Sequence, residues 1–209
     1  MQVTVFGANG NIGSRVVERL LTNGHTVRAF VHGSHSFEQS NNLQVIQGDI
    51  GDKEQVAQAI DGSDAVVSAL GSWGTKSKVI LTVGMTNIIP AMQSTGVRRI
   101  VSLTGADARD PADQPSLRQR LTRVMLFAIA PKVLTDGERH IALLRRSNLD
   151  WTVIRSPVMK DSGPADYTLS MKAPKPWASI PRVAVVSAMI HTLERGLHQK
   201  SSPFVDKHN

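Results

Sequence analysis

The chain has 209 residues, 41% of them hydrophobic, a formal net charge of +7 and no cysteine. This length is typical of a single domain, and the lack of cysteine excludes disulfides, thiolate metal sites and cysteine nucleophiles. No apolar run approaches the ~20 residues that span a membrane, and the N-terminus enters a strand directly, so we expect no signal peptide, no membrane partner and a cytoplasmic location.

The positive charge favours an anionic ligand. Nucleic acid is disfavoured, because the basic residues are scattered and only three Trp and one Tyr are available for base stacking. No cluster of His, Asp and Glu has metal-ligand spacing, so we expect no metal. With nucleic acid and membranes disfavoured, we expect a small-molecule partner, and we expect the protein to be a monomer or a homodimer.

The first elements are a strand, a glycine-rich turn and a helix. Residues 3–6 form an apolar run, Gly7, Gly10 and Gly13 follow at a spacing of three, and a helical apolar pattern continues to about residue 23. Gly7 permits a tight turn, Gly10 lets a pyrophosphate approach the backbone, and Gly13 lets the helix pack on the strand. We expect the dinucleotide to be bound by this turn, at Gly7, Asn9, Gly10, Asn11, Ile12 and Gly13.

The end of the second strand, residues 25–31, predicts the choice of cofactor. An NAD site places an Asp or Glu about 20 residues after the glycines, to bind the ribose 2′-hydroxyl. No acid occurs between residues 31 and 37 here, whereas Arg28, His32, Ser34 and His35 are suited to a 2′-phosphate. NADP(H) is therefore the expected cofactor, with NAD(H) as the alternative.

Strands and helices then alternate, which predicts a parallel sheet covered on both faces. Strands are expected at 43–47, 64–69, 98–103 and 151–154, with shorter ones at 167–171 and 204–205. Helices are expected at 53–60, 80–95, 136–146 and 181–197. Asp52 is suited to cap the first of these. Ala69, Leu70 and Gly71 end a strand at the carboxyl edge, where such folds bind ligands.

Three further segments are singled out by composition. Trp73 stands in a polar loop, where it either stacks on a planar ligand or packs on its neighbours, and Lys76 and Lys78 there either attract carboxylates or are solvated. Leu117, Leu121, Val124 and Met125 form a helical stripe before the break at Pro131. Three arginines, Arg118, Arg120 and Arg123, lie off this stripe, as a solvated face or, less favourably, as a docking site for an acidic partner. Residues 155–180 are rich in Gly, Pro and Lys, typical of a substrate loop or lid.

Two of these segments resemble a known family. Gly-Ala-Asn-Gly-Asn-Ile-Gly at residues 7–13 is similar to the GxxGxxG of extended and atypical short-chain dehydrogenase/reductases. Ser-Asn-Leu-Asp-Trp-Thr-Val-Ile-Arg-Ser-Pro at 147–157 resembles the SGLDWTIVRP segment of their NmrA-like, NAD(P)H-binding branch, and Asp-Gly-Glu-Arg at 136–139 resembles its DxER helix. The resemblance covers nearly the whole chain. It implies an α/β fold of the Rossmann type: a doubly wound parallel sheet in one domain, 1–209, with a small C-terminal substrate or lid region.

The resemblance also implies roles for particular residues. Asp49, followed by Ile50, matches the family's GD at the adenine end of the cofactor. Ser102 and Thr104 stand where the family keeps hydroxyls near the nicotinamide, so they are the candidate catalytic groups. Pro157 and Val158 match a segment that lines the nicotinamide pocket. NADP-binding members often carry Arg where this chain has His32.

The proton donor typical of short-chain dehydrogenases is missing. They use a Tyr with a Lys four positions later, whereas the one tyrosine, Tyr167, has Met171 at that position. We therefore expect an NADPH-dependent reductase of a conjugated acceptor such as a flavin, quinone or tetrapyrrole, to which the cofactor gives hydride while solvent supplies the proton. The alternative is a non-catalytic, NAD(P)H-binding redox-sensing regulator of the NmrA type. A sugar epimerase is disfavoured because that chemistry needs the tyrosine base.

Overall fold

The computed structural model describes residues 1–38, 40–73, 75–175 and 177–207, and for residues 118 and 119 only the backbone is described. The central sheet is built from strands listed here in chain order: β1 (Gln2–Phe6), β2 (Thr26–Val31), β3 (Leu43–Gln47), β4 (Ala65–Ser68), β5 (Arg99–Gly105), β6 (Asp150–Ser156), β8 (Thr168–Ser170) and β10 (Phe204–Asp206). Their order in the sheet is β3-β2-β1-β4-β5-β6-β10-β8. All neighbours from β3 to β10 pair in parallel, and only β8 is antiparallel to β10.

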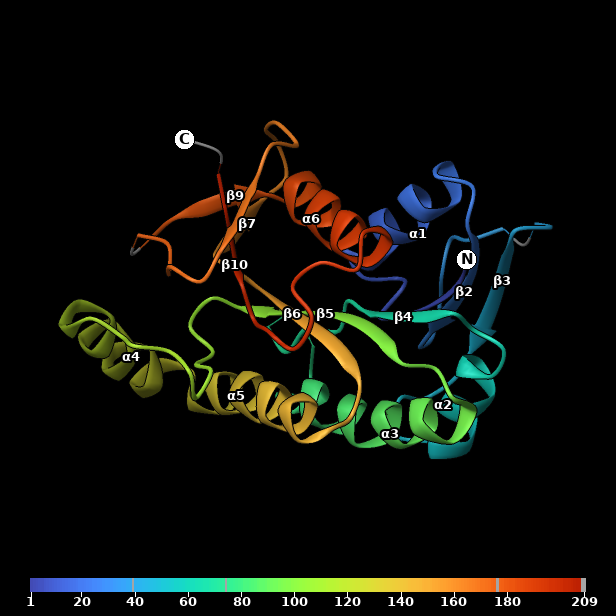
Figure 1. Cartoon of the computed structure of the whole chain (residues 1–209), viewed down its shortest axis with the longest axis horizontal. Coiled ribbons are helices and arrows are strands. Elements are labelled where there is room, and N and C mark those ends of the chain that lie inside the picture. The colour runs from blue at the N-terminus through green and yellow to red at the C-terminus, as the bar shows by residue number, and fades with distance from the viewer. Residues whose placement is uncertain (39, 74, 176, 208–209) are drawn as a thin grey trace.

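Helices cover both faces of this sheet. They are α1 (Gly13–Thr22), α2 (Lys53–Ile60), α3 (Ile80–Thr95), α4 (Leu117–Ile129), α5 (Pro131–Arg146) and α6 (Arg182–Glu194). Helices α1 and α6 pack on one face, and α2, α3 and α5 on the other (Figure 1). Strand side chains alternate between the two layers, since Val27, Ala29 and Val31 belong to the first core and Phe30 to the second. The predicted doubly wound α/β fold is confirmed.

The chain reverses its direction across the sheet between β1 and β4. From β1 it adds β2 and β3 on one side, and then returns to add β4, β5 and β6 on the other. In open α/β sheets, ligands bind outside the carboxyl ends of the strands at such a switch point. The glycine turn after β1 and the segment after β4 therefore meet at the expected ligand site.

Several boundaries follow from local chemistry. Asp52 caps α2 by accepting hydrogen bonds from the backbone N–H groups of Glu54 and Gln55, as predicted. Gly96, with φ +77°, ends α3. Helix α5 begins at Pro131, five residues before the predicted start, because proline suits the first helical turn. Asp136 lies inside the helix, and its carboxylate accepts hydrogen bonds from the start of α3.

The C-terminal region contains a feature that the sequence did not predict. Strands β7 (Val158–Lys160) and β9 (Ser179–Pro181) pair in parallel as a separate two-stranded sheet within residues 155–180. It lies on the same side of the main sheet as α6 (Figure 1). Val158 pairs with Ser179, so the segment before β9 returns to the end of β6.

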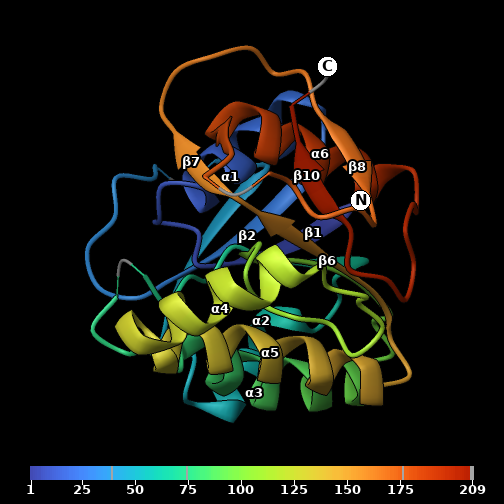
Figure 2. The same cartoon turned by 90° about the vertical axis from the view of Figure 1, so that its left-hand side faces the viewer.

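Helix α4 packs alongside α5, and in Figure 2 it lies nearest the viewer. Its apolar stripe faces away from the core, and the side chain of Arg123, expected on a solvated face, forms an ion pair with Glu138 of α5. None of the described helices is both long and apolar enough to cross a membrane.

Candidate functional site

The glycine turn is shaped by contacts that leave no room for side chains. A Cβ on Gly13 would lie 2.0 Å from the carbonyl oxygen of Gly7, and a Cβ on Gly7, where φ is +73°, would lie 3.0 Å from the backbone of Ala69 and Leu70. At Gly10 a Cβ would lie 3.2 Å from the Gly7 oxygen, and beyond its chain neighbours no other atom of the described residues lies within 4 Å. Gly7 and Gly13 therefore serve the packing of the turn, whereas Gly10 leaves its outer side open.

The start of α1 is suited to a phosphate group. No side chain caps this helix, and its first turn contains no acid. A helix start presents N–H groups and the positive end of the helix dipole, which together attract a pyrophosphate. Asn11 is exposed beside it, and Ile12 is buried in the core beneath.

Asn9 connects the glycine turn to the loop after β2. Its side-chain amide donates to the carbonyl oxygens of His32 at 3.1 Å and Ser34 at 3.2 Å. The imidazole of His32 is exposed at the carboxyl end of β2, and His35 stacks on Phe37 in the same loop. The loop expected to receive the 2′-phosphate is thereby held next to the glycine turn.

The predicted adenine end also lies at this edge. Asp49 is exposed after β3, and its carboxylate accepts the backbone N–H of Gly51 at 2.8 Å. The Ile50 carbonyl accepts from the side chain of Asn87 in α3. After β4, Ala69 and Leu70 are half-buried and Gly71 is exposed. Most of the predicted cofactor-binding residues are thus grouped at the carboxyl ends of β1 to β4.

Arg28 is an exception, because its side chain is directed away from this edge. It pairs with Thr4 in the middle of the sheet, and its guanidinium donates to the carbonyl oxygen of Asp61 just after α2. Because α2 runs antiparallel to the strands, its end lies at the amino edge, opposite the ligand site. The Arg28 side chain therefore stabilises the end of α2 and is directed away from a 2′-phosphate.

Ser102 is also placed differently from the prediction. Its side chain is fully buried, and its hydroxyl lies 2.9 Å from Nε2 of His140 in α5. Thr104, two residues along, faces the same layer and is 7% exposed, beside Gly137. Strand alternation directs both hydroxyls toward α5, so Ser102 has no surface for a ligand and is removed from the candidate catalytic groups.

His140 itself is a buried neutral group. Desolvation lowers its pKa to about 4, although the nearby charge of Asp136 acts in the opposite direction. Its Nδ1 has no hydrogen-bond partner among the described residues. Its interaction with Ser102 ties α5 to β5 in the middle of the core.

Asp136, in the segment that resembles the DxER helix, organises the loop beside the site. It is 1% exposed and accepts hydrogen bonds from the hydroxyl of Ser72 at 2.5 Å and from the backbone N–H groups of Leu81 and Thr82. This carboxylate therefore caps α3 and anchors the segment after β4. Lys78 donates to carbonyl oxygens of the same loop, including that of Thr75 at 2.8 Å, so its ammonium closes the loop.

Apolar side chains are exposed on either side of the carboxyl edge. Trp73 is 64% exposed after β4, and Val158 is 70% exposed after Pro157 at the end of β6. Trp177, which the sequence analysis did not single out, is 82% exposed and has a φ of +65°, a conformation rare for a bulky residue. Trp177 lies two positions before Ser179, the residue that pairs with Val158. Trp177 is therefore close to Val158 only because β7 pairs with β9, a pairing that the sequence did not predict.

Two acidic groups bear on proton transfer. The hydroxyl of Tyr167 lies 2.7 Å from Nδ1 of His191, near the end of α6. The last residue of α6, Glu194, contacts His25, which lies at the amino edge of the sheet. Tyr167 is therefore far from the ligand edge. Asp107, in contrast, follows β5 at that edge, and partial burial raises the pKa of its carboxyl group.

Comparison with known proteins agrees with this geometry. The model of a family described as NAD(P)H-binding matches residues 7–195. A curated relative, an uncharacterized chloroplast protein of Arabidopsis thaliana, is 28% identical over 174 residues. That alignment covers 78% of this chain but 61% of the relative, so the chain spans less than two thirds of its length.

Two solved structures share the fold over nearly their whole length. A short-chain dehydrogenase/reductase from Veillonella parvula in complex with NADP has a TM-score of 0.80 and 19% identity, covering 99% of this chain and 94% of the other. An anaerobilin reductase from Escherichia coli O157:H7 has a TM-score of 0.74 and 18% identity, covering 100% and 98%. The family match over residues 7–195 shows that this chain belongs to the NAD(P)H-binding family, and its glycine turn and uncapped helix lie within the matched region.

Proposed function

Because this chain belongs to the NAD(P)H-binding family, we propose that it is an NADPH-dependent reductase that delivers hydride to a conjugated acceptor. The observation that carries the proposal is the arrangement at the carboxyl edge. Gly10 is open toward the start of α1, and exposed Trp73, Val158 and Trp177 lie where β4 and β6 end. This edge offers a phosphate site next to apolar surface.

The residues present fit a dinucleotide in the expected orientation. The start of α1 would hold the pyrophosphate, and the loop after β3 with Asp49 would face the adenine. Pro157 and Val158 would line the nicotinamide side. The bound nicotinamide supplies the hydride, so this chain contributes binding, orientation and exclusion of water.

The preference for NADPH over NADH is part of the proposal. The loop after β2 has no acid from residue 31 to 37, and Asn9 holds it beside the pyrophosphate turn. An exposed imidazole at His32 is suited to a phosphate group, whereas a carboxylate there would repel it.

The acceptor is proposed to be flat, apolar and conjugated, as flavins, quinones and tetrapyrroles are. Trp73 and Trp177 present indole rings on which such a molecule can stack. Such an acceptor takes hydride into a conjugated system and gains its proton from solvent, which fits the distance of Tyr167 from the site. The similarity in fold to an anaerobilin reductase supports this class of acceptor.

The experiment is NADPH oxidation with a panel of flavins, quinones and biliverdins. Turnover with at least one of them is expected, and Trp73→Ala and Trp177→Ala should each raise KM for that acceptor while leaving NADPH affinity unchanged. Tight NADPH binding without oxidation by any acceptor would favour the redox-sensing regulator instead.

A further inference from the structure

Helix α4 exposes an apolar face that no described part of the chain covers. Six of its large apolar side chains are 47–74% exposed: Leu117, Leu121, Val124, Met125, Phe127 and Ile129. Four of them, at positions 117, 121, 124 and 125, have the i, i+4, i+7, i+8 spacing of one helix face. The opposite side of the helix packs on α5, where Arg123 pairs with Glu138. The apolar face is thus directed into solvent along the whole helix.

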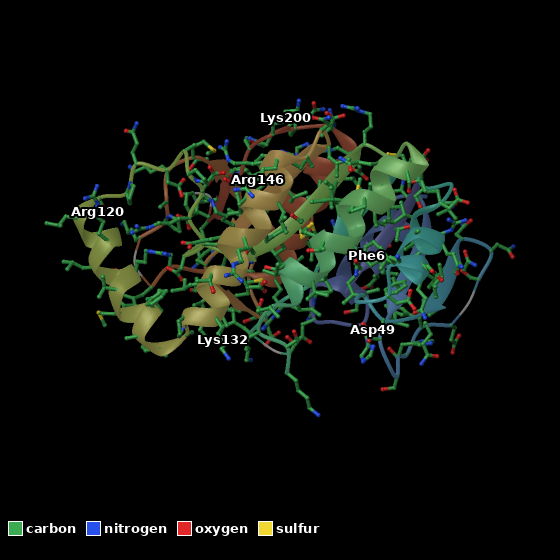
Figure 3. The ribbon with its side chains drawn as sticks, turned by 90° about the horizontal axis from the view of Figure 1, so that it is seen from below. Phe6, Asp49, Arg120, Lys132, Arg146 and Lys200 are labelled. Carbon is green, nitrogen blue, oxygen red and sulfur yellow. The ribbon has the colours of Figure 1, made fainter. Side chains whose placement is uncertain are left out.

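Only positive charge accompanies this face in the sequence. Between Asp113 and Asp136 the chain has four basic residues and no Asp or Glu. Arg120 is exposed on α4, and Lys132 is exposed at the start of α5. Figure 3 shows Arg120 and Lys132 toward the two ends of α4. An occupant of this face must therefore be apolar at its centre and anionic around it.

A cationic groove adjoins the same helix. Between α4 and the segment before it lies a groove of about 550 Å³, lined by Arg109, Pro115, Arg120, Arg123, Val124 and Phe127. Desolvation lowers the pKa of Arg109, and the charges of Arg123 and Arg120 act in the same direction, while the charges of Glu138 and Asp113 oppose them. Three guanidinium groups are therefore gathered next to the apolar face. Arg123 is paired with Glu138, whereas Arg120 is exposed and suited to a phosphate group.

We propose that α4 docks on an anionic phospholipid surface, with its apolar face in the acyl region and the arginines at the headgroup phosphates. A basic amphipathic helix with large apolar side chains on one face binds membranes in this way. A second copy of the chain fits less well, because a two-fold contact would bring together two identical surfaces that both carry positive charge, including Arg120. Each copy also has a net charge of +7. The proposal departs from the expectation of no membrane partner.

Flotation with lipid vesicles tests the docking without cofactor or turnover, so its outcome is independent of the proposed reductase activity. The wild-type protein should bind vesicles of phosphatidylcholine with phosphatidylglycerol at least about tenfold better than vesicles of phosphatidylcholine alone, and high salt should weaken binding. The double variant Leu121→Ser/Val124→Ser should lose about tenfold or more, because it removes apolar surface that enters the acyl region. Arg120→Glu should lower binding to the anionic vesicles only.

Met171→Ser provides a matched control, since Met171 is also an exposed apolar residue, at 53%, but lies outside α4. It should bind vesicles like the wild type, and all variants should keep the wild-type Tm and NADPH affinity. Absence of flotation, equal binding to both vesicle types, or binding unaffected by the double variant would overturn the proposal. A dimer in light scattering that the double variant abolishes would assign the face to a second copy and overturn it as well.

Discussion

The hydroxyl of Ser102 and Nε2 of His140 lie 2.9 Å apart, and both side chains are fully buried. The pair joins β5 to α5 and lies beneath the ligand edge. A hydroxyl expected to touch the nicotinamide thus has a structural role instead.

Ser102→Ala should lower the free energy of unfolding by about 1–3 kcal/mol, because it leaves both ring nitrogens of His140 buried without partners. Its kcat and KM should stay within about threefold of the wild type. Urea unfolding and steady-state kinetics measure the two effects. A large fall in kcat with unchanged stability would return Ser102 to the catalytic group.

His140 predicts a loss of stability in acid. Its folded pKa of about 4 lies below the unfolded value of 6.5, so the unfolded state binds more protons between these two pH values. The contribution to stability is complete above pH ~6.5, falls as the pH drops toward 4, and amounts to about 3 kcal/mol in total. His140→Gln should flatten the dependence of unfolding free energy on pH in this window. An equally steep dependence in the variant would assign it to other groups.

Gly10→Ala and Gly13→Ala form a matched pair within one turn. A Cβ at Gly10 would lie 3.2 Å from the Gly7 oxygen and near no other non-adjacent atom of the described residues, so this variant should fold normally but lose NADPH affinity by about tenfold or more. A Cβ at Gly13 would meet the Gly7 oxygen at 2.0 Å, so that variant should lose stability as well. Calorimetry with NADPH and thermal unfolding separate the two results. Wild-type NADPH affinity in a folded Gly10→Ala protein would place the pyrophosphate elsewhere.

NADPH should bind more tightly than NADH. His32→Asp should lower NADPH affinity by about tenfold or more while leaving NADH affinity equal or higher, because a carboxylate repels the 2′-phosphate. Glu38→Ala, a change in charge seven residues from the strand end, serves as the control. Equal dissociation constants of the wild-type protein for both cofactors at low salt would refute the preference.

Much of the fold could be predicted from the sequence because it depends on local patterns. The glycine turn, the cap at Asp52 and the helix at residues 80–95 each reflect short-range chemistry, and each lies where the sequence predicts it. The sequence reading went wrong where contacts between distant segments decide the outcome. Whether Arg28 reaches the ligand edge depends on where α2 ends.

The site shows the same division. Strand alternation directs Ser102 toward α5, but only the position of His140, 38 residues later, shows that its hydroxyl is occupied. Trp177 approaches the end of β6 through the β7–β9 pairing, which three-residue strands do not reveal in a sequence. The exposed face of α4 has the apolar periodicity of a core helix, so the pattern alone does not show whether that face is buried or exposed to solvent.

We expect hydride transfer without an essential side-chain acid, and Asp107, which follows β5 at the ligand edge and has a raised pKa, is the group with which to test this. The rate of NADPH oxidation in a single turnover is measured for the wild type, Asp107→Asn and the distant-site control Tyr167→Phe, with the best acceptor of the panel. A positioned acid contributes about 10²–10⁴-fold, so both variants should stay within about tenfold of the wild type if no side chain supplies the proton. A thousandfold fall in Asp107→Asn would show that this carboxyl group delivers the proton.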